Sequence, residues 1–188
     1  MLRRILPNLL LVLFWLLPVG AAAASEDAIE VVIQVDGETV HADVNLTVHA
    51  TPLEVWAVLT DFGHMQEFVS NLTSSQVLSR EGNLVMVAQK GKASVGPLSF
   101  EFDSIREIQL TPFELISTRQ VGGNLKKFDG TTHLAAENGH TRIHHHSDAI
   151  PNVWIPPLIG RKFIESETRE QFAEIRQEIL RRKQSAAK

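Results

Sequence analysis

The stretch PPLIGRKFIESETREQFAEIRQEILRRK, residues 156–183, determines how the rest of the chain is interpreted. No proline follows Pro157, and apolar residues recur at the i, i+3 and i+4 spacings of one face of an amphipathic helix. These residues are Ile164, Phe172, Ile175 and Ile179. At about 1.5 Å per residue the predicted helix is roughly 40 Å long, too long for a small domain to cover with other helices.

The middle of this helix face is polar. Thr168 lies on the apolar stripe but is surrounded by the polar run Glu165–Gln171. A helix that is apolar near both ends and polar in the middle could close a hollow instead of filling a core. The alternative is that it packs on a sheet with a local polar bulge, and periodicity does not separate the two.

Most of the remaining chain is predicted to form strands. From Val40 to Ala50, apolar and polar residues alternate, which is typical of a strand with one wet face. Because antiparallel strands usually pair with their sequence neighbours, we expect one curved sheet covered by the long helix, an α+β fold. The predicted strands are Ile29–Val35, Val40–Ala50, Ser74–Ser79, Leu84–Lys92, Leu98–Gln109, Glu114–Val121, Lys126–Glu137 and His140–Ile150.

Two short helices are predicted after the second strand. Thr51 at the N-cap, Pro52 at the first helical position and Glu54 at the third form a capping box. This helix breaks near Gly63, and a second short turn is expected around Met65.

The N-terminus has the layout of a secretory signal peptide. Arg3 and Arg4 precede an apolar run and the small residues 21–24, so residues 1–24 are predicted to be removed after Ala23 or Ala24. The chain has no cysteine, which fits a bacterial periplasm better than a eukaryotic secretory route. The alternative is a retained N-terminal membrane anchor. Residues 25–39 are predicted to form an extension or strand, 40–183 the domain and 184–188 a disordered tail.

The charge balance excludes one class of partner. Without residues 1–24 the chain carries 16 basic and 22 acidic residues, a net charge of −6. Such a balance argues against nucleic acid, and we expect membrane contact only transiently or through an uncleaved N-terminus.

Several local sequences together are similar to one known superfamily. They are Thr51–Phe62 (TPLEVWAVLTDF), Gly96–Phe100 (GPLSF), Asn124–Gly130 (NLKKFDG) and Pro156–Leu158 (PPL). On these residues the stretch from Val44 to about Arg182 resembles the SRPBCC or START-like superfamily, in its polyketide cyclase/dehydrase or coenzyme Q-binding branch. The resemblance implies a helix-grip fold: about seven antiparallel strands wrapped round a long C-terminal helix, with an elongated cavity between them.

A hairpin turn sets the expected inner face. If Asn138-Gly139 is a two-residue turn, Leu134 lies opposite Ile143 and Thr132 opposite His145, on one shared face. The apolar pair marks this face as the inner one. The residues expected at the cavity or its mouth are Gln89, Phe100, Phe102, Ser117, Arg119, Phe128, Thr132, Leu134, Ile143, His145, Trp154, Phe163, Thr168 and Phe172.

Arg119 is the expected polar anchor. The alternation Leu115, Ser117, Arg119 points its guanidinium inward, where a carboxylate or carbonyl of a ligand could accept a charge-assisted hydrogen bond. The alternative is a bulge or edge position that leaves Arg119 in water.

Three histidines are weak metal-site candidates. The same hairpin register places His133 opposite His144, with His146 two residues further on the same outward face. Three imidazoles at such spacing could hold zinc or copper. However, outward histidines are usually solvated, and no carboxylate is evident beside them.

We expect an exported protein that carries or senses a hydrophobic small molecule, such as a lipid, quinone or polyketide-like compound, without a cofactor. No cysteine nucleophile, Gly-x-Ser-x-Gly elbow, His-Glu-x-x-His motif or phosphate-binding glycine loop is present. The alternatives are a cyclase/aromatase-type enzyme on the same scaffold and an interaction module with a vestigial cavity. A second ionisable group facing His145 or Arg119 would favour the enzyme, and a filled interior the module.

Overall fold

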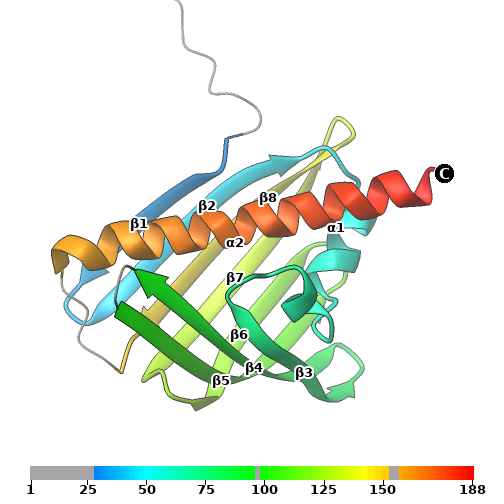
Figure 1. Cartoon of the computed structure of the whole chain (residues 1–188). Coiled ribbons are helices and arrows are strands. Elements are labelled where there is room, and N and C mark those ends of the chain that lie inside the picture. Colours follow the sequence, from blue (N-terminus) through cyan, green and yellow to red (C-terminus); the bar gives the residue numbers. More distant parts are fainter. Residues whose placement is uncertain (1–27, 96–97, 153–156) are drawn as a thin grey trace, which may run out of the picture.

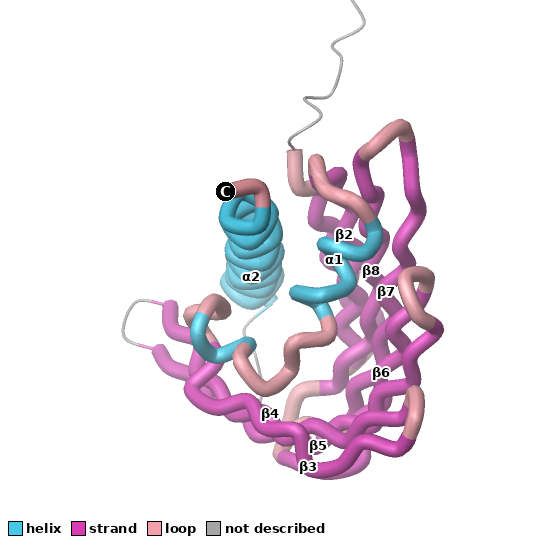
Figure 2. Tube along the Cα trace, turned by 90° about the vertical axis from the view of Figure 1, so that its right-hand side faces the viewer, coloured by secondary structure: helices cyan, strands magenta, loops and turns pink. Residues whose placement is uncertain are grey.

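A computed structural model describes residues 28–95, 98–152 and 157–188. One open antiparallel sheet curves round a long C-terminal helix (Figure 1), and the curvature is clearest when the helix is seen end-on (Figure 2). The strand order is β1-β2-β8-β7-β6-β5-β4-β3. The strands are β1 (Glu30–Asp36), β2 (Thr39–Val48), β3 (Leu72–Glu81), β4 (Leu84–Val95), β5 (Leu98–Thr111), β6 (Leu115–Gly123), β7 (Lys127–Glu137) and β8 (His140–Ile150).

This arrangement is the predicted α+β helix-grip fold. The resemblance implied about seven strands, and the sheet has eight because β1 pairs with β2 along its whole length. The helices are α1 (Pro52–Leu59), the 3-10 turn η1 (Met65–Glu67) and α2 (Pro157–Ala186). Among the residues described, no helix is both long and apolar enough to cross a bilayer.

The C-terminal half of α2 is the part that packs tightly. Phe172, Ile175 and Ile179 are buried in the core together with residues of β2 and α1. Helix α2 also lies against β1, where Arg169 donates a hydrogen bond to the backbone oxygen of Ile29. The apolar stripe predicted for residues 164–179 therefore does face the sheet.

The start of α1 follows the predicted capping box. The Glu54 backbone N–H donates to Thr51 Oγ1 at 3.3 Å, and the Thr51 N–H donates to Glu54 Oε2 at 2.7 Å. These bonds satisfy two backbone donors that the first helical turn otherwise leaves unpaired.

The β7–β8 hairpin has the predicted register. Leu134 pairs with Ile143, Thr132 with His145, and His133 with His144. Asn138 and Gly139 both have positive φ, 47° and 84°, as a type I′ turn requires. This turn determines which residues of both strands face inward.

The predicted orientation of β6 is wrong. Ile116 pairs with the inward Thr132, so Ile116 and Thr118 face inward while Ser117 and Arg119 face outward. Arg119 is exposed, and its Nη2 lies 2.7 Å from Glu107 Oε1 on neighbouring β5. The physical reason is that both faces of β6 carry mixed polarity, so pairing with β7, not alternation, decides the register.

Gly91 is required by close packing between β3, β4 and β5. Leu72 pairs with Gly91, and the Lys92 N–H donates to the Asn71 carbonyl at 2.9 Å. A Cβ at position 91 would overlap both the Phe102 ring and the Asn71 carbonyl oxygen.

We predict that Gly91→Ala lowers the free energy of unfolding by about 1–3 kcal/mol, the usual cost of overpacking. Gly63→Ala is the control, because a Cβ there meets nothing within 4 Å. Urea denaturation of both variants tests this, and equal midpoints for Gly91→Ala and wild type would contradict it.

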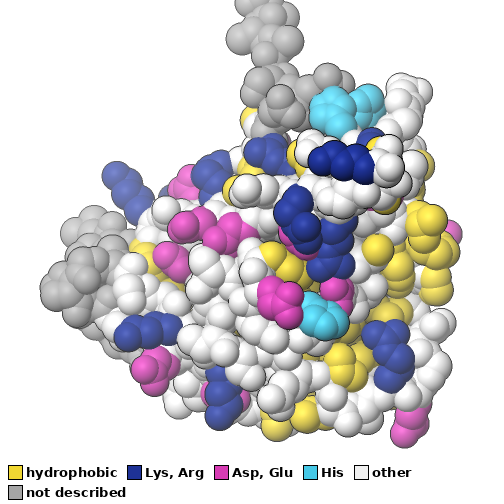
Figure 3. All heavy atoms as spheres, turned by 45° about the vertical axis from the view of Figure 1, so that its right-hand side comes forward, with side chains coloured by type: hydrophobic (Ala, Val, Ile, Leu, Met, Phe, Trp, Pro, Cys, Tyr) yellow, Lys and Arg dark blue, Asp and Glu magenta, His cyan; other side chains and the backbone are white. Residues whose placement is uncertain are grey.

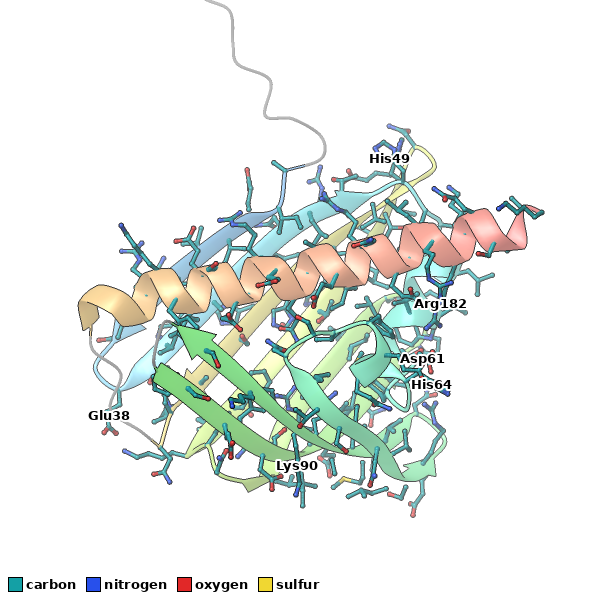
Figure 4. All side chains as sticks on the ribbon, viewed as in Figure 1. Glu38, His49, Asp61, His64, Lys90 and Arg182 are labelled. Atoms are coloured by element: carbon teal, nitrogen blue, oxygen red, sulfur yellow. The ribbon has the colours of Figure 1, made fainter. Side chains whose placement is uncertain are left out.

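The C-terminal end of α2 is tied by ion pairs. Glu178 is buried (8% exposed) and lies 2.6 Å from both Arg181 Nε and Arg182 Nε. Arg182 also reaches Asp61, whose other neighbour is His64; these three lie together in Figure 4, and Figure 3 shows charged and histidine side chains gathered on this face. The hydrogen bond from Arg181, followed by that from Arg182, lowers the pKa of Glu178 to about 2.

This lowered pKa predicts a pH dependence. The stabilisation by ionised Glu178 is complete above its ordinary pKa of 4.5 and is lost as the pH falls towards 2, because the unfolded chain then binds the proton first. We expect Glu178→Gln to reduce the melting temperature at pH 7 and to flatten its fall between about pH 4.5 and 2. Glu170→Gln, at an exposed position of the same helix, is the control. Parallel melting curves for Glu178→Gln and wild type across this pH range would refute the assignment.

Candidate ligand-binding cavity

A cavity of about 380 Å³ lies between the inner face of the sheet and α2. Its walls come from all strands except β1, from α1 with the η1 region and the loops beside it, from the β6–β7 loop and from α2. Seven of the residues expected at the cavity line it: Gln89, Phe102, Phe128, Thr132, His145, Thr168 and Phe172.

The polar middle of α2 covers this hollow. Thr168 and Gln171 line the cavity, between Ile164 on one side and Phe172 and Ile175 on the other. The first reading of the helix stripe is therefore confirmed: the helix packs firmly near its C-terminal half and leaves space beneath its middle.

The charged group in the cavity is Arg106, which the sequence interpretation missed. On β5, Ser104, Ile108 and Leu110 are buried, and the same alternation turns Arg106 inward. Its Cζ lies 4.5 Å from the centroid of the Phe128 ring, a cation–π contact. The alternation Phe102, Ser104, Arg106, Ile108 was the available signal.

Arg106 is a half-buried cation with no carboxylate beside it in the cavity lining. Its Nε has no hydrogen-bond partner, and the described residues that line the cavity include no Asp or Glu. Burial lowers the pKa of Arg106 to about 10, so the guanidinium is still protonated at neutral pH. A buried polar group of this kind is costly unless something accepts from it.

His145 lies beside Arg106 and is neutral. Its Nδ1 is 2.9 Å from Thr132 Oγ1, and its ring centroid is 5.2 Å from that of Phe172. Burial, and then the nearby charge of Arg106, lowers the pKa of His145 to about 4. Although part of its surface is accessible, that surface faces the cavity.

The cavity is also lined by polar side chains, some with a hydrogen-bond partner and some without one. Gln89 Nε2 donates to Ser75 Oγ at 3.0 Å, so this predicted residue is held against the wall. Asn71 also lines the cavity, and its Oδ1 has no partner among the described residues. The cavity thus offers an unpaired donor on Arg106 and an unpaired acceptor on Asn71.

The remaining predicted residues lie elsewhere. Leu134 and Ile143 belong to the solid core, and Ser117 and Arg119 lie on the outer face. Phe100 and Phe163 contact each other with tilted rings whose centroids are 5.7 Å apart, but neither lines the cavity. Trp154 falls outside the described residues.

The outward histidines have acidic neighbours, contrary to expectation. His133 and His144 stack with ring centroids 6.4 Å apart. His146 Nδ1 lies 2.8 Å from Asp43 Oδ1, and His146 Nε2 lies 3.2 Å from Asp148 Oδ1. No local pattern could indicate Asp43, which comes from β2 about a hundred residues earlier, whereas Asp148 could have been predicted because it lies two residues after His146 on the same face of β8.

A curved antiparallel sheet that grips a long C-terminal helix, with a largely apolar cavity between them, defines a START-like helix-grip protein. The chain belongs to the family described as polyketide cyclase / dehydrase and lipid transport, which matches residues 48–176.

Solved structures agree on the fold. The Zhui aromatase/cyclase from Streptomyces sp. R1128 is 16% identical, with a TM-score of 0.65, covering 77% of this chain and 95% of that one. A STAR-related lipid transfer protein from Xanthomonas axonopodis is 13% identical, with a TM-score of 0.69, covering 85% and 96%. The lipid transfer and protein localization domain of human StarD13 is 15% identical, with a TM-score of 0.62, covering 82% and 86%. No curated protein matches the sequence.

Proposed function

We propose that this protein binds an amphipathic lipid in the cavity under α2 and carries or senses it without changing it chemically. The apolar walls would hold the hydrocarbon part, and Arg106 would hold an anionic or carbonyl head group. The observation that carries the proposal is the guanidinium of Arg106, whose Nε is buried and unpaired in a largely apolar cavity.

The size and lining of the cavity suit such a ligand. A volume of about 380 Å³ lies within the range of small-molecule sites, about 300–1,000 Å³. Phe102, Phe128 and Phe172 offer apolar area, whose burial gives about 25 cal/mol per Å². Such an open interior does not favour an interaction module with a vestigial cavity.

The electrostatics of the cavity favour a ligand with a negatively charged head group. A carboxylate would neutralise Arg106 where no described lining residue can, and its two oxygens match the planar fork of a guanidinium. A quinone or ketone carbonyl would accept one hydrogen bond but leave the charge unbalanced. We therefore rank fatty acid-like ligands above quinones and neutral polyketide-like compounds.

Arg106→Met tests the anchor, because it keeps the length of the side chain and removes the charge. We expect the Kd for cis-parinaric acid, followed by its fluorescence, to rise about 10–100-fold, the value of a hydrogen bond to a charged group. Displacement by hexadecanol, which has no carboxylate, should be nearly unchanged. Decylubiquinone serves as the carbonyl competitor.

The matched control is Arg119→Met, which removes an exposed guanidinium from the outer face. It should bind the fatty acid like wild type. Removing a buried charge need not destabilise the fold, so thermal melting should show both variants folded. Equal fatty-acid affinity for Arg106→Met and wild type would overturn the role of Arg106.

A cyclase-type enzyme is the second candidate, and one observation favours it. Arg106 and His145 are two ionisable groups in one cavity, as an enzyme that stabilises an enolate and moves a proton would need. The lowered pKa of His145 weighs against it, since such an imidazole is a weak base at neutral pH. Turnover of a poly-β-ketone that is lost in His145→Gln would favour the enzyme over the carrier.

We also propose that the protein is exported. The support is the sequence of residues 1–24, with its basic start, apolar run and small residues before Ser25. When the full chain is expressed in a bacterium, we expect intact-mass measurement of the periplasmic fraction to find a protein beginning at Ala24 or Ser25. A full-length chain found only in the membrane fraction would favour the retained anchor.

A further inference from the structure

Four side chains on the outer face of the sheet form a two-by-two arrangement of histidines and aspartates. His41 and Asp43 come from β2, and His146 and Asp148 from β8. In the strand register, His41 is opposite Asp148 and Asp43 is opposite His146. Their side chains are 31–40% exposed, so the group is partly shielded but open to solvent. We refer to these four residues as the outer His/Asp cluster.

Three donor atoms of this cluster converge on one point. Asp148 Oδ1 lies 2.6 Å from His41 Nδ1 and 3.2 Å from His146 Nε2. One ligand atom from each of these three residues lies within 4.8 Å of the other two.

The contact with Asp43 determines the protonation of His146. His146 Nδ1 lies 2.8 Å from Asp43 Oδ1, and since an ionised carboxylate only accepts, this nitrogen must donate. In a neutral imidazole, Nε2 then carries a lone pair. That lone pair faces an oxygen of Asp148 at 3.2 Å, so the contact is favourable only with a second proton on His146 or a metal ion between the two atoms.

We propose that His41, His146 and Asp148 bind a divalent transition-metal ion of the zinc class, with Asp43 orienting His146. Two imidazole nitrogens and one carboxylate oxygen are a ligand set typical of zinc. Asp43 acts as the carboxylate that accepts the second N–H of a metal-bound histidine.

Two of the three donor-atom spacings are near those around a tetrahedral ion, and all three are within 4.8 Å. Metal–ligand distances of about 2.0–2.2 Å place neighbouring tetrahedral ligands about 3.3 Å apart. The His146–Asp148 distance of 3.2 Å already matches. The 2.6 Å contact between His41 Nδ1 and Asp148 is a hydrogen bond, so on metal binding His41 Nδ1 would release its proton and the contact would open by several tenths of an ångström. The fourth position faces solvent and would hold water or an external ligand.

The surroundings are acidic enough to attract a cation. Asp129 on β7 lies opposite Asp148. Asp129 also forms an ion pair with Lys127, whose Nζ lies 3.0 Å from Asp129 Oδ2. His144 Nε2 lies 3.9 Å from Asp43 Oδ1 and is not one of the three grouped ligands. The site lies on the opposite side of the sheet from the lipid cavity, so it does not depend on the proposed function.

The experiment is isothermal titration of ZnCl₂ into the mature, metal-stripped protein, purified without a histidine tag. We expect one ion per chain with a Kd in the micromolar range or below. His146→Gln should weaken binding at least tenfold, and Asp43→Asn by about 10–100-fold, as for other residues that orient a ligand. His133→Gln, which lies on the same face outside the outer His/Asp cluster, should bind zinc like wild type.

A spectroscopic measurement identifies the ligands directly. Co²⁺ bound to wild type should give the intense visible absorption of a tetrahedral site, and His41→Gln should lose it. Saturable binding that is equal in His146→Gln and wild type, or no heat up to about 100 µM zinc, would overturn the proposal. In the latter case the four groups are ion pairs around a doubly protonated His146. Thermal melting distinguishes an unfolded variant from a folded one that has lost the site.

Discussion

The structure depends on how the C-terminal half of α2 packs into the core while the middle of the helix lines a cavity. Phe172, Ile175 and Ile179 anchor one half in the core, and Arg182, held by Glu178, links the C-terminal end to Asp61. Around Thr168 the helix has no bulky apolar side chain to insert. The cavity is therefore a direct result of where apolar residues are missing from one helix stripe, and it needs no special distortion of the backbone.

A charge in this cavity means that the empty protein holds an unfavourable interaction. The buried Nε of Arg106 has no acceptor, and the face of Phe128 cannot balance a full positive charge. Much of the affinity for an anionic head group would come from removing this cost, and not from strong new contacts. The same reasoning explains why neutral lipids would bind through area alone.

The fold and one part of the candidate site could be predicted from the sequence. Strand ranges, the capping box and the β7–β8 register were predictable because each has a strong local signal, such as the Asn138-Gly139 turn. The orientation of β6 was not, since polar residues lie on both of its faces. Arg106 was missed for a related reason: arginines are usually exposed, and only the pairing of β5 with its neighbours shows that its face is covered. Asp43 and His146 meet across strands that are far apart in the chain, which no local pattern reveals.

The consecutive residues His144, His145 and His146 show how much depends on strand alignment. Along β8 the middle ring faces the enclosed interior, while its two neighbours face the opposite side of the sheet. One extra residue in the Asn138-Gly139 turn would leave the composition almost unchanged but exchange these environments. A homologue with a longer turn would therefore need different residues on both faces of β8. When related chains are compared, the length of this turn is a better guide than the number of histidines to which residues line the cavity.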